Sequence, residues 1–207
     1  MSNIQDNNQP NPPAAHGLSV EVQSHLDEEP DPLRSGMSPL PDGFADLLRR
    51  GVALALETAE IPSAEIEIAI VDDARIHELN RRHLNHDWET DVISFPYERN
   101  EAFVSGELII SWETACREAK ETGWPALTEL ALYAIHGSLH LTGMDDQTAA
   151  ERAEMREAER AVLEQLRPSG FERYDVANRG EASLRDGACG LEVNRQLLDG
   201  NGKEVQK

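Results

Sequence analysis

The sequence predicts an α/β (α+β) domain, in which a small mixed sheet of about four strands is packed with helices around a central buried helix. Two stretches carry this prediction. Residues 65–71 alternate apolar and polar side chains, which is typical of a half-buried strand. Residues 127–141 are apolar on nearly every side, which is typical of a helix enclosed in a core. Strand-like and helix-like segments alternate along the rest of the chain, as they do in α/β folds.

Short segments with the pattern of strands are 18–23, 65–71, 90–96 and 106–111. The third of these segments ends at Pro96. Because proline cannot donate a hydrogen bond to a sheet, we expect the strand to stop there. Residues 97–105 then form a loop or hairpin that leads into the last strand.

Segments with apolar residues three or four positions apart predict helices at 42–59, 72–83, 112–122, 127–141 and 148–166. Asp42 is the expected N-cap of the first helix, and Asp72 or Asp73 is that of the second. Gly123 ends the third helix, and Pro125 suits the first turn of the fourth. The last helix alternates Glu and Arg on its polar side, which predicts a solvated face with ion pairs one turn apart.

The composition divides the chain into one domain and two tails. Residues 1–16 are polar and rich in Pro and Asn, which predicts a disordered N-terminal tail. Residues 17–167 form the folded domain, and residues 168–207 form a polar C-terminal tail. A chain of 207 residues is long enough to bury a full core in a single domain.

The net charge and the cysteines indicate which partners and which cellular compartment suit this chain. A net charge of -20 is a poor match for a nucleic-acid binder, so contact with RNA would need a local basic patch, metal ions or a protein partner. No apolar run approaches the roughly 20 residues that span a bilayer. The N-terminus lacks the pattern of a secretory signal. Cys116 and Cys189 stand alone, so we expect a reducing, cytoplasmic setting.

The residues with the clearest chemical pattern lie between His136 and Asp146, in the run H-G-S-L-H-L-T-G-M-D-D. His136 and His140 are four positions apart, so on a helix their side chains share one face. A turn at Gly143 could bring Asp146 back toward both imidazoles. Two nitrogens and one carboxylate oxygen, with the fourth position open, are the ligands of a catalytic zinc site.

Two other interpretations of this run must be weighed. The spacing is also that of metzincin proteases, but these carry a glutamate as general base directly after the first histidine, where this chain has Gly137. A protease interpretation therefore lacks its base. A histidine pair at helical spacing is also common in ordinary cores and surfaces. The positions of Gly143 and Asp146 favour the metal site over this simpler interpretation.

Several stretches occur together in one order. They are Leu79-Asn80, T-D-V-I-S-F-P at 90–96, G-E-L-I-I-S at 106–111, the run at 136–146, and Met155, Glu159 and Leu163 in the last helix. With these motifs the chain resembles the YbeY endoribonuclease family of bacteria over residues 18–167. The resemblance implies a single α/β domain with one zinc ion. It identifies His136 and His140 as metal ligands that act in catalysis through the metal, with Asp146 as the third ligand.

The resemblance also implies a function. It is that of a single-strand-specific endoribonuclease in ribosomal RNA maturation, at the 3′ end of the small-subunit RNA, and in ribosome quality control in the cytoplasm. The implied partners are ribosomal RNA and the small ribosomal subunit, with ribosomal proteins or a GTPase as further candidates, and neither a membrane nor DNA. One alternative is a ribosome-associated factor with a mainly structural zinc and little nuclease activity. Another is a zinc hydrolase of a different small substrate.

The chain departs from the family pattern at two positions. Asp146 stands where the family has a third histidine, so the ligand set carries an extra negative charge and a harder donor. Leu84 stands where the family commonly places an arginine suited to contact phosphate. Arg81, Arg82 and His86 lie nearby and are the candidate RNA-binding residues, with Arg82 also a candidate for catalysis. The two arginines fit an ordinary solvated helix end equally well.

Further polar residues are candidates for supporting roles. Each histidine ligand should donate its second ring N–H to a carboxylate or a backbone carbonyl. Asp145 is the candidate for such an outer contact, although it could equally cap the turn. Glu107 and Ser94 should lie near strand ends that face the helix, as polar groups of the cleft, with a local hydrogen bond as the simpler role for Ser94.

Overall fold

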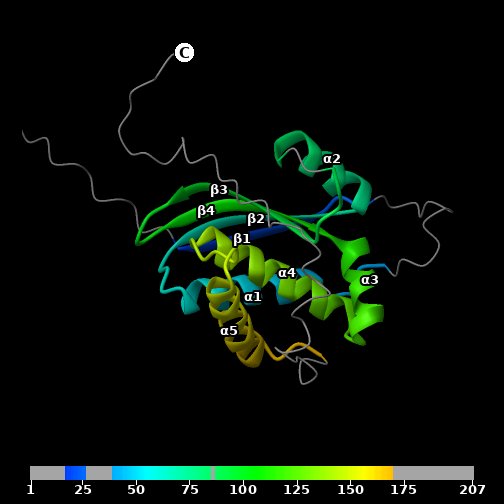
Figure 1. Cartoon of the computed structure of the whole chain (residues 1–207). Helices are drawn as coiled ribbons and strands as arrows, with labels where there is room; N and C mark the ends of the chain where they lie inside the picture. The colour runs from blue at the N-terminus through cyan, green and yellow to red at the C-terminus, as the bar shows by residue number, and fades with distance from the viewer. Residues whose placement is uncertain (1–16, 27–38, 85–86, 170–207) are drawn as a thin grey trace, which may run out of the picture.

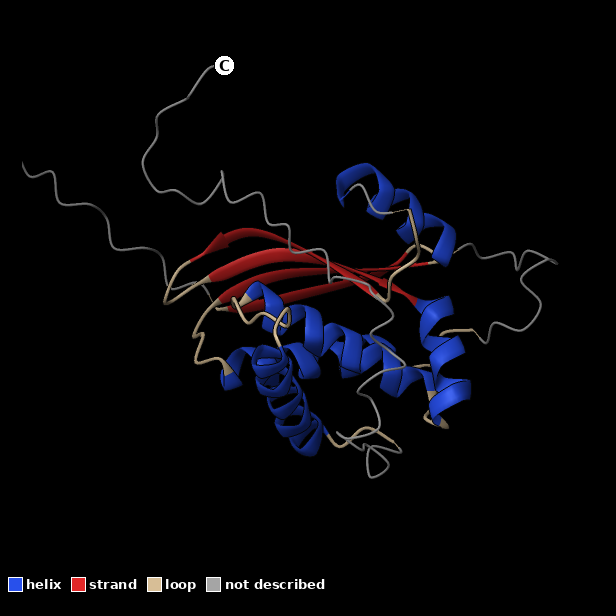
Figure 2. Cartoon of the chain, viewed as in Figure 1, coloured by secondary structure: helices blue, strands red, loops and turns tan. Residues whose placement is uncertain are grey.

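The computed structural model describes residues 17–26, 39–84 and 87–169. The predicted N-terminal tail and nearly all of the C-terminal tail, together with His86 and Cys189, lie outside the described residues. The described part is built from the predicted kinds of element. It consists of one sheet covered by helices on both faces (Figures 1 and 2). This confirms the expected α/β class.

The sheet is mixed and has four strands in the order β1-β2-β4-β3. The strands are β1 (Leu18–Ser24), β2 (Ala64–Val71), β3 (Val92–Arg99) and β4 (Val104–Ser111). β1 and β4 both pair in parallel with β2, whereas β3 pairs antiparallel with β4. β3 and β4 are joined by a hairpin. β3 forms one edge of the sheet, because it is last in the strand order.

The prediction that the third strand ends at Pro96 is wrong. β3 continues through Pro96 to Arg99, and its register shifts between Pro96 and Glu98. Because β3 is an edge strand, the donor that proline lacks is not needed by a second neighbouring strand. The irregularity at Tyr97 is a bulge of the kind that bends an edge strand.

The helices form two unequal layers. They are α1 (Phe44–Thr58), α2 (Asp73–Leu84), α3 (Trp112–Thr122), α4 (Ala126–Leu141) and α5 (Ala149–Leu166). Helices α1, α4 and α5 lie under one face of the sheet, α2 lies on the opposite face, and α3 stands at one end (Figure 1). Within the described residues, none of these helices has the length and apolar character needed to cross a membrane.

The ends of the helices agree only in part with the predicted caps. Gly43, with φ 79°, occupies the N-cap of α1, so the assignment of Asp42 is wrong. The chain enters α1 through a left-handed turn that glycine adopts without steric cost. Asp72 caps α2, because its carboxylate accepts a hydrogen bond from the Arg75 N–H at 2.7 Å. Gly123 ends α3 as expected.

Helix α4 is the centre of the larger core, as its sequence predicted. Leu130, Ile135 and Leu139 on this helix are fully buried, and burying each such side chain contributes about 1.5 to 3 kcal/mol. Gly137 faces the sheet. A Cβ there would lie 2.9 Å from a methyl of Leu108, so only glycine lets α4 approach this closely. The C-terminal part of α4 is thereby fixed against the sheet, and its last two turns carry the two histidines of the predicted metal site.

Candidate metal centre

His136 and His140 lie one turn apart at the C-terminal end of α4 and face each other. Their rings stand perpendicular, with centroids 4.5 Å apart. The two Nε2 atoms are 3.0 Å apart. His140 is 2% exposed, and the His136 side chain is 14% exposed. The pair therefore sits at the margin of the core, where water has little access and unpartnered polar groups are costly.

The chain turns sharply after α4 and brings Asp146 to the histidines. Gly143 has φ 101°, a conformation that favours glycine, and its N–H donates to the His140 carbonyl at 2.8 Å. An Asp146 carboxylate oxygen lies 4.0 Å from His136 Nε2. One ligand atom from each of the three residues lies within 4.8 Å of the other two. Of the predicted site residues, these three are brought together.

The outer nitrogen of each imidazole already has an acceptor. His136 Nδ1 lies 2.6 Å from a carboxylate oxygen of Glu159, and His140 Nδ1 lies 2.8 Å from the Met144 carbonyl. A carboxylate and a carbonyl can only accept, so each Nδ1 is assigned a proton. When Nε2 carries no proton, each ring presents a lone pair there. This is the orientation that metal-binding histidines adopt.

The three residues fit a metal ion. Two Nε2 lone pairs that face each other at 3.0 Å repel unless a proton or a cation lies between them. Zinc–nitrogen bonds of 2.0–2.1 Å at a tetrahedral angle place two ligand nitrogens roughly 3.3 Å apart. The measured separation is close to this value. The third donor, Asp146, adds a hard oxygen and a negative charge, and three protein ligands leave one position of a tetrahedral ion open.

The protonation of the ligands follows from their burial. Burial, reinforced by the nearby His136, lowers the pKa of His140 to about 3, although its bond to the Met144 carbonyl acts in the opposite direction. His140 is therefore neutral near pH 7, as a metal ligand must be. Burial raises the pKa of Asp146, and the nearby Asp145 and Glu159 carboxylates raise it further. His136 acts in the opposite direction and lowers it. A bound cation would oppose this rise.

The turn that carries Asp146 is held by its own hydrogen bonds. The Asp145 carboxylate accepts the Asp146 N–H at 2.8 Å, which is the turn-capping role considered for Asp145. Arg152 donates to the Asp146 carbonyl at 2.9 Å and to the Gln147 carbonyl at 2.6 Å. The carboxylate that contacts an imidazole belongs to Glu159 on α5, and not to Asp145.

In the sequence, this role is indicated by the position of Glu159 on the apolar side of α5, where the residue is 7% exposed.

The other predicted polar residues are divided between the two faces of the sheet. Ser94 faces α4 and is buried, and its hydroxyl donates to the Gly137 carbonyl at 3.2 Å. Glu107 lies on the opposite face and accepts a hydrogen bond from Tyr97 at 3.0 Å. The prediction that Glu107 faces the helix is therefore wrong. The reason is the alternation of side chains along β4, since the neighbouring Leu108 is the residue that points into the core under the sheet.

The candidate RNA-binding arginines also lie away from the histidine pair. Arg81 and Arg82 belong to α2, which packs on the face opposite to α4 (Figure 1). Arg82 pairs with Glu78 at 3.1 Å, on the same helix. The structure therefore does not bring these arginines together with the three candidate ligands. His86, the third candidate, lies outside the described residues.

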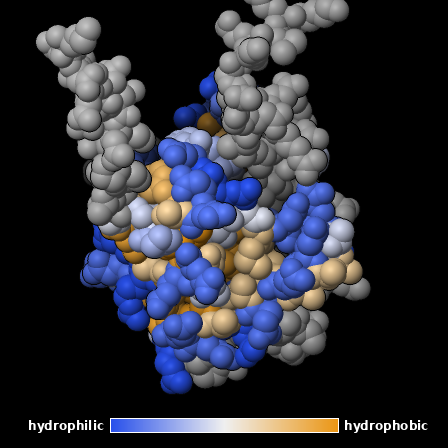
Figure 3. Space-filling view, turned by 90° about the vertical axis from the view of Figure 1, so that its left-hand side faces the viewer, coloured by the Kyte–Doolittle hydropathy of each residue, from blue (hydrophilic) through white to orange (hydrophobic). Residues whose placement is uncertain are grey.

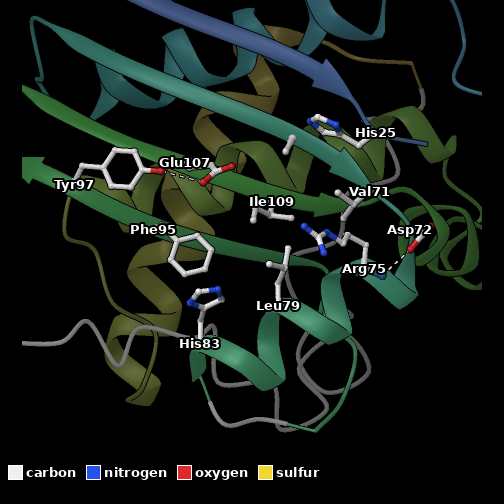
Figure 4. A pocket seen from close by; sticks show the side chains of 11 residues that line it. His25, Val71, Asp72, Arg75, Leu79, His83, Phe95, Tyr97, Glu107 and Ile109 are labelled. Atoms are coloured by element: carbon white, nitrogen blue, oxygen red, sulfur yellow. Dashed lines mark hydrogen bonds between the residues drawn. The ribbon is translucent and has the colours of Figure 1, made fainter. Parts of the chain in front are cut away.

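A pocket of about 610 Å³ lies on this opposite face, between α2 and the sheet (Figure 4). Phe95 and His83 meet edge to face in it, with ring centroids 5.7 Å apart. Burial and the hydrogen bond to Glu107 raise the pKa of Tyr97 to about 12. The pocket mixes acidic, basic, aromatic and aliphatic side chains. It shares no residue with the histidine centre on the other side of the sheet.

The chain is similar to proteins of a known family. The family described as Endoribonuclease YbeY matches residues 39–167. A relative of that description from Rhodopirellula baltica is 42% identical over 148 residues, which cover 70% of this chain and 75% of that protein. One from Elusimicrobium minutum is 39% identical over 113 residues, covering 53% and 79%. The chain belongs to the YbeY family.

Two further proteins are similar to this chain. A protein of the same description from Desulfitobacterium hafniense is 40% identical over 131 residues, covering 58% of this chain and 83% of its own length. A solution structure of a protein from Thermotoga maritima is similar over 75% of this chain and 97% of that chain, with a TM-score of 0.47 and 22% identity.

Proposed function

We propose that this chain is a metal-dependent endoribonuclease that cleaves single-stranded RNA. Its proposed role is ribosomal RNA maturation, at the 3′ end of the small-subunit RNA, and ribosome quality control. Support comes from the family, whose members matched above carry the description endoribonuclease. The observation that carries the proposal is that His136, His140 and Asp146, in a chain of this family, meet with their ligand atoms within 4.8 Å.

The proposed cofactor is one zinc ion held by His136 Nε2, His140 Nε2 and the Asp146 carboxylate. Two imidazoles and one carboxylate are a ligand set typical of catalytic zinc. When bound, zinc would supply a Lewis acid that polarises a phosphoryl oxygen and acidifies a water molecule. This chemistry suits the hydrolysis of a phosphodiester.

The protein's own residues would prepare the site for that chemistry. Glu159 and the Met144 carbonyl fix the tautomer and the orientation of the two rings. Burial keeps His140 neutral, so no proton needs to leave this ring before it can act as a ligand near pH 7. The side chains of His136 and Asp146 keep 14% and 13% of their surface exposed, and a substrate would approach the centre from this side.

The setting of the reaction is part of the proposal. Residues 17–167 would form the catalytic domain. Ribosomal RNA and the small ribosomal subunit would be the partners in the cytoplasm, with ribosomal proteins or a GTPase as additional contacts. Because α2 lies across the sheet from the centre, a role of Arg81 and Arg82 in RNA binding requires that RNA reach around the β3 edge.

The test compares matched histidine variants for metal content and cleavage. His140→Ala should lose bound zinc and the cleavage of single-stranded RNA. His77→Ala, at an exposed position on α2 where His77 contacts Asp87 at 3.0 Å, should keep both. Removing zinc with a chelator should abolish cleavage, and adding it back should restore cleavage. A zinc-loaded parent protein that sediments with small ribosomal subunits but cuts no RNA would contradict the proposal and favour a mainly structural zinc.

A further inference from the structure

An arginine side chain lies directly against the turn that joins the candidate ligands. The position that a Cβ would take on Gly143 is 1.8 Å from Arg99 Nη1 and 2.7 Å from Arg99 Cζ. The guanidinium therefore occupies the space that a side chain at position 143 would need. Gly143 stands between the ligands His140 and Asp146 in the sequence. The Arg99 guanidinium thus lies against the turn that joins two of the candidate ligands.

Arg99 comes from a different element, far from the turn in the sequence. It is the last residue of β3, where its backbone pairs with Val104 across the hairpin. The β3–β4 hairpin and the end of α4 lie at the same end of the molecule, on the left in Figure 1. Figure 3 faces that end and shows mostly hydrophilic residues around smaller hydrophobic areas. Arg99 is exposed there, so a ligand from solvent can reach it.

The guanidinium of Arg99 differs from that of Arg152 in its hydrogen bonds. Arg152 also contacts the turn, but it donates to the carbonyls of Asp146 and Gln147, so its donors serve the fold. Within the described part of the chain, Arg99 takes part in no side-chain hydrogen bond and no ion pair. Its planar fork of N–H donors is free for an anion, and such a fork matches two oxygens of one phosphate.

Apart from a bound metal ion, the surroundings of the centre are acidic, so a further cation would favour the approach of a polyanion. Asp146 is a ligand candidate, and both Asp145 and Glu159 act on it with like charge. The whole chain carries a net charge of -20. Arg81 and Arg82 lie on the opposite face of the sheet and cannot offset this negative charge at the centre itself.

We propose that Arg99 forms a phosphate-binding subsite beside the candidate metal centre and holds a backbone phosphate of the RNA strand. The inference rests on the proposed function, because the ligand is the RNA that the centre would cleave. Arg99 contacts the substrate and not the metal. It positions the strand over the turn at Gly143, so that the neighbouring phosphodiester faces the open side of the centre. Recognition is by the phosphate and is independent of base sequence.

The experiment measures binding separately from cleavage. A fluorescent single-stranded oligonucleotide with 2′-O-methyl riboses, which resists cleavage through the 2′ oxygen, is titrated with zinc-loaded protein at several salt concentrations. The variants are Arg99→Gln, which removes the charge, and Arg99→Lys, which keeps it. The matched control is Arg160→Gln, which removes an arginine that pairs with Glu157 and Glu164 on α5. Zinc content is measured for every variant.

The subsite predicts a distinct pattern. Arg99→Gln should weaken binding at least fivefold and lower the slope of log affinity against log salt by about 0.7, the value for one phosphate contact on a single strand. Arg99→Lys should recover most of the slope, and zinc content should stay at the parent level. Parent-like affinity and slope in Arg99→Gln would overturn the subsite. A parent protein that neither binds nor cleaves single-stranded RNA would instead overturn the proposed function.

Discussion

Glu159 and His136 are 23 positions apart in the sequence, yet a Glu159 carboxylate oxygen lies 2.6 Å from His136 Nδ1. The contact joins α5 to the C-terminal part of α4. It places a carboxylate behind an imidazole whose Nε2 faces the candidate metal position, an arrangement that fixes the ring and raises its basicity as a ligand. The centre is therefore built by α4, the turn after it and α5 together.

This contact predicts how the affinity for zinc depends on Glu159. Glu159→Ala should lower zinc affinity by roughly 10- to 100-fold, because His136 loses the partner that orients its ring. Glu159→Gln should have a smaller effect, since its amide oxygen can still accept from Nδ1. Competition with a chromogenic chelator gives the affinities, and Glu154→Ala, at an exposed position of the same helix, is the control. Equal affinities for Glu159→Ala and the control would show that the contact is irrelevant to the metal.

Much of this architecture was predictable because local patterns report burial directly. The alternation at residues 65–71 and the all-round apolar helix at 127–141 predicted β2 and α4, since each element is buried as its pattern requires. The spacing of His136, His140 and Asp146 was informative for the same reason. The residues belong to one helix end and one turn, so local geometry alone brings them together.

The features that were missed depend on contacts between distant segments. Pro96 continues β3 because that strand lies at the edge of the sheet, and sequence alone does not give strand order. Glu107 lies on the face opposite to the predicted one. Side chains alternate along β4, and the neighbouring Leu108 points into the core. Glu159 acts where α5 meets α4, and Arg99 lies where β3 meets the turn after α4. No spacing rule connects positions so far apart.

The aspartate at position 146 should set the strength of metal binding. Asp146→Ala should lower zinc occupancy, because it removes one of three protein ligands. Asp146→His should keep or raise zinc occupancy, since a neutral imidazole is a softer donor for zinc and carries no charge that must be desolvated. Elemental analysis of protein purified in parallel gives the occupancies. If Asp146→Ala keeps full zinc occupancy, Asp146 is not a ligand.

Gly143 and Gly43 both have positive φ and provide a matched pair. Gly143→Ala and Gly43→Ala should each destabilise the fold by about 1 to 2 kcal/mol, because alanine is strained at positive φ. A Cβ at position 43 meets no atom within 4 Å, whereas one at 143 must displace the flexible end of Arg99. Gly143→Ala should therefore also weaken RNA binding. Urea unfolding and oligonucleotide titration separate the two effects. Equal RNA binding by both variants would contradict the placement of Arg99.

The partly buried carboxylate of Asp73, at the start of α2, predicts acid sensitivity. Burial raises the pKa of Asp73, but hydrogen bonds from Ser111, Arg117 and Thr114 outweigh burial and hold that pKa below its usual value of 3.8. Because the folded pKa is the lower one, this stabilisation is complete above the unfolded pKa and is lost as pH falls through the folded pKa. Asp73→Asn should cost about 2 kcal/mol at pH 7, and much less near pH 3.

Urea unfolding of the parent and of Asp73→Asn at both pH values gives this difference. Asp46→Asn, which removes an exposed carboxylate that pairs with Arg49, should show little change at either pH. A cost of Asp73→Asn that is the same at pH 3 and pH 7 would contradict the assignment of the stabilisation to the ionised carboxylate.

The central claim is that His136, His140 and Asp146 hold one zinc ion. X-ray absorption at the zinc edge of the parent protein and of His140→Ala tests it most directly. The parent should show two imidazole nitrogens at about 2.0–2.1 Å together with oxygen ligands at a similar distance. His140→Ala should lose zinc, or one imidazole from the signal. A parent spectrum without imidazole ligands, or an unchanged spectrum in His140→Ala, would contradict the claim.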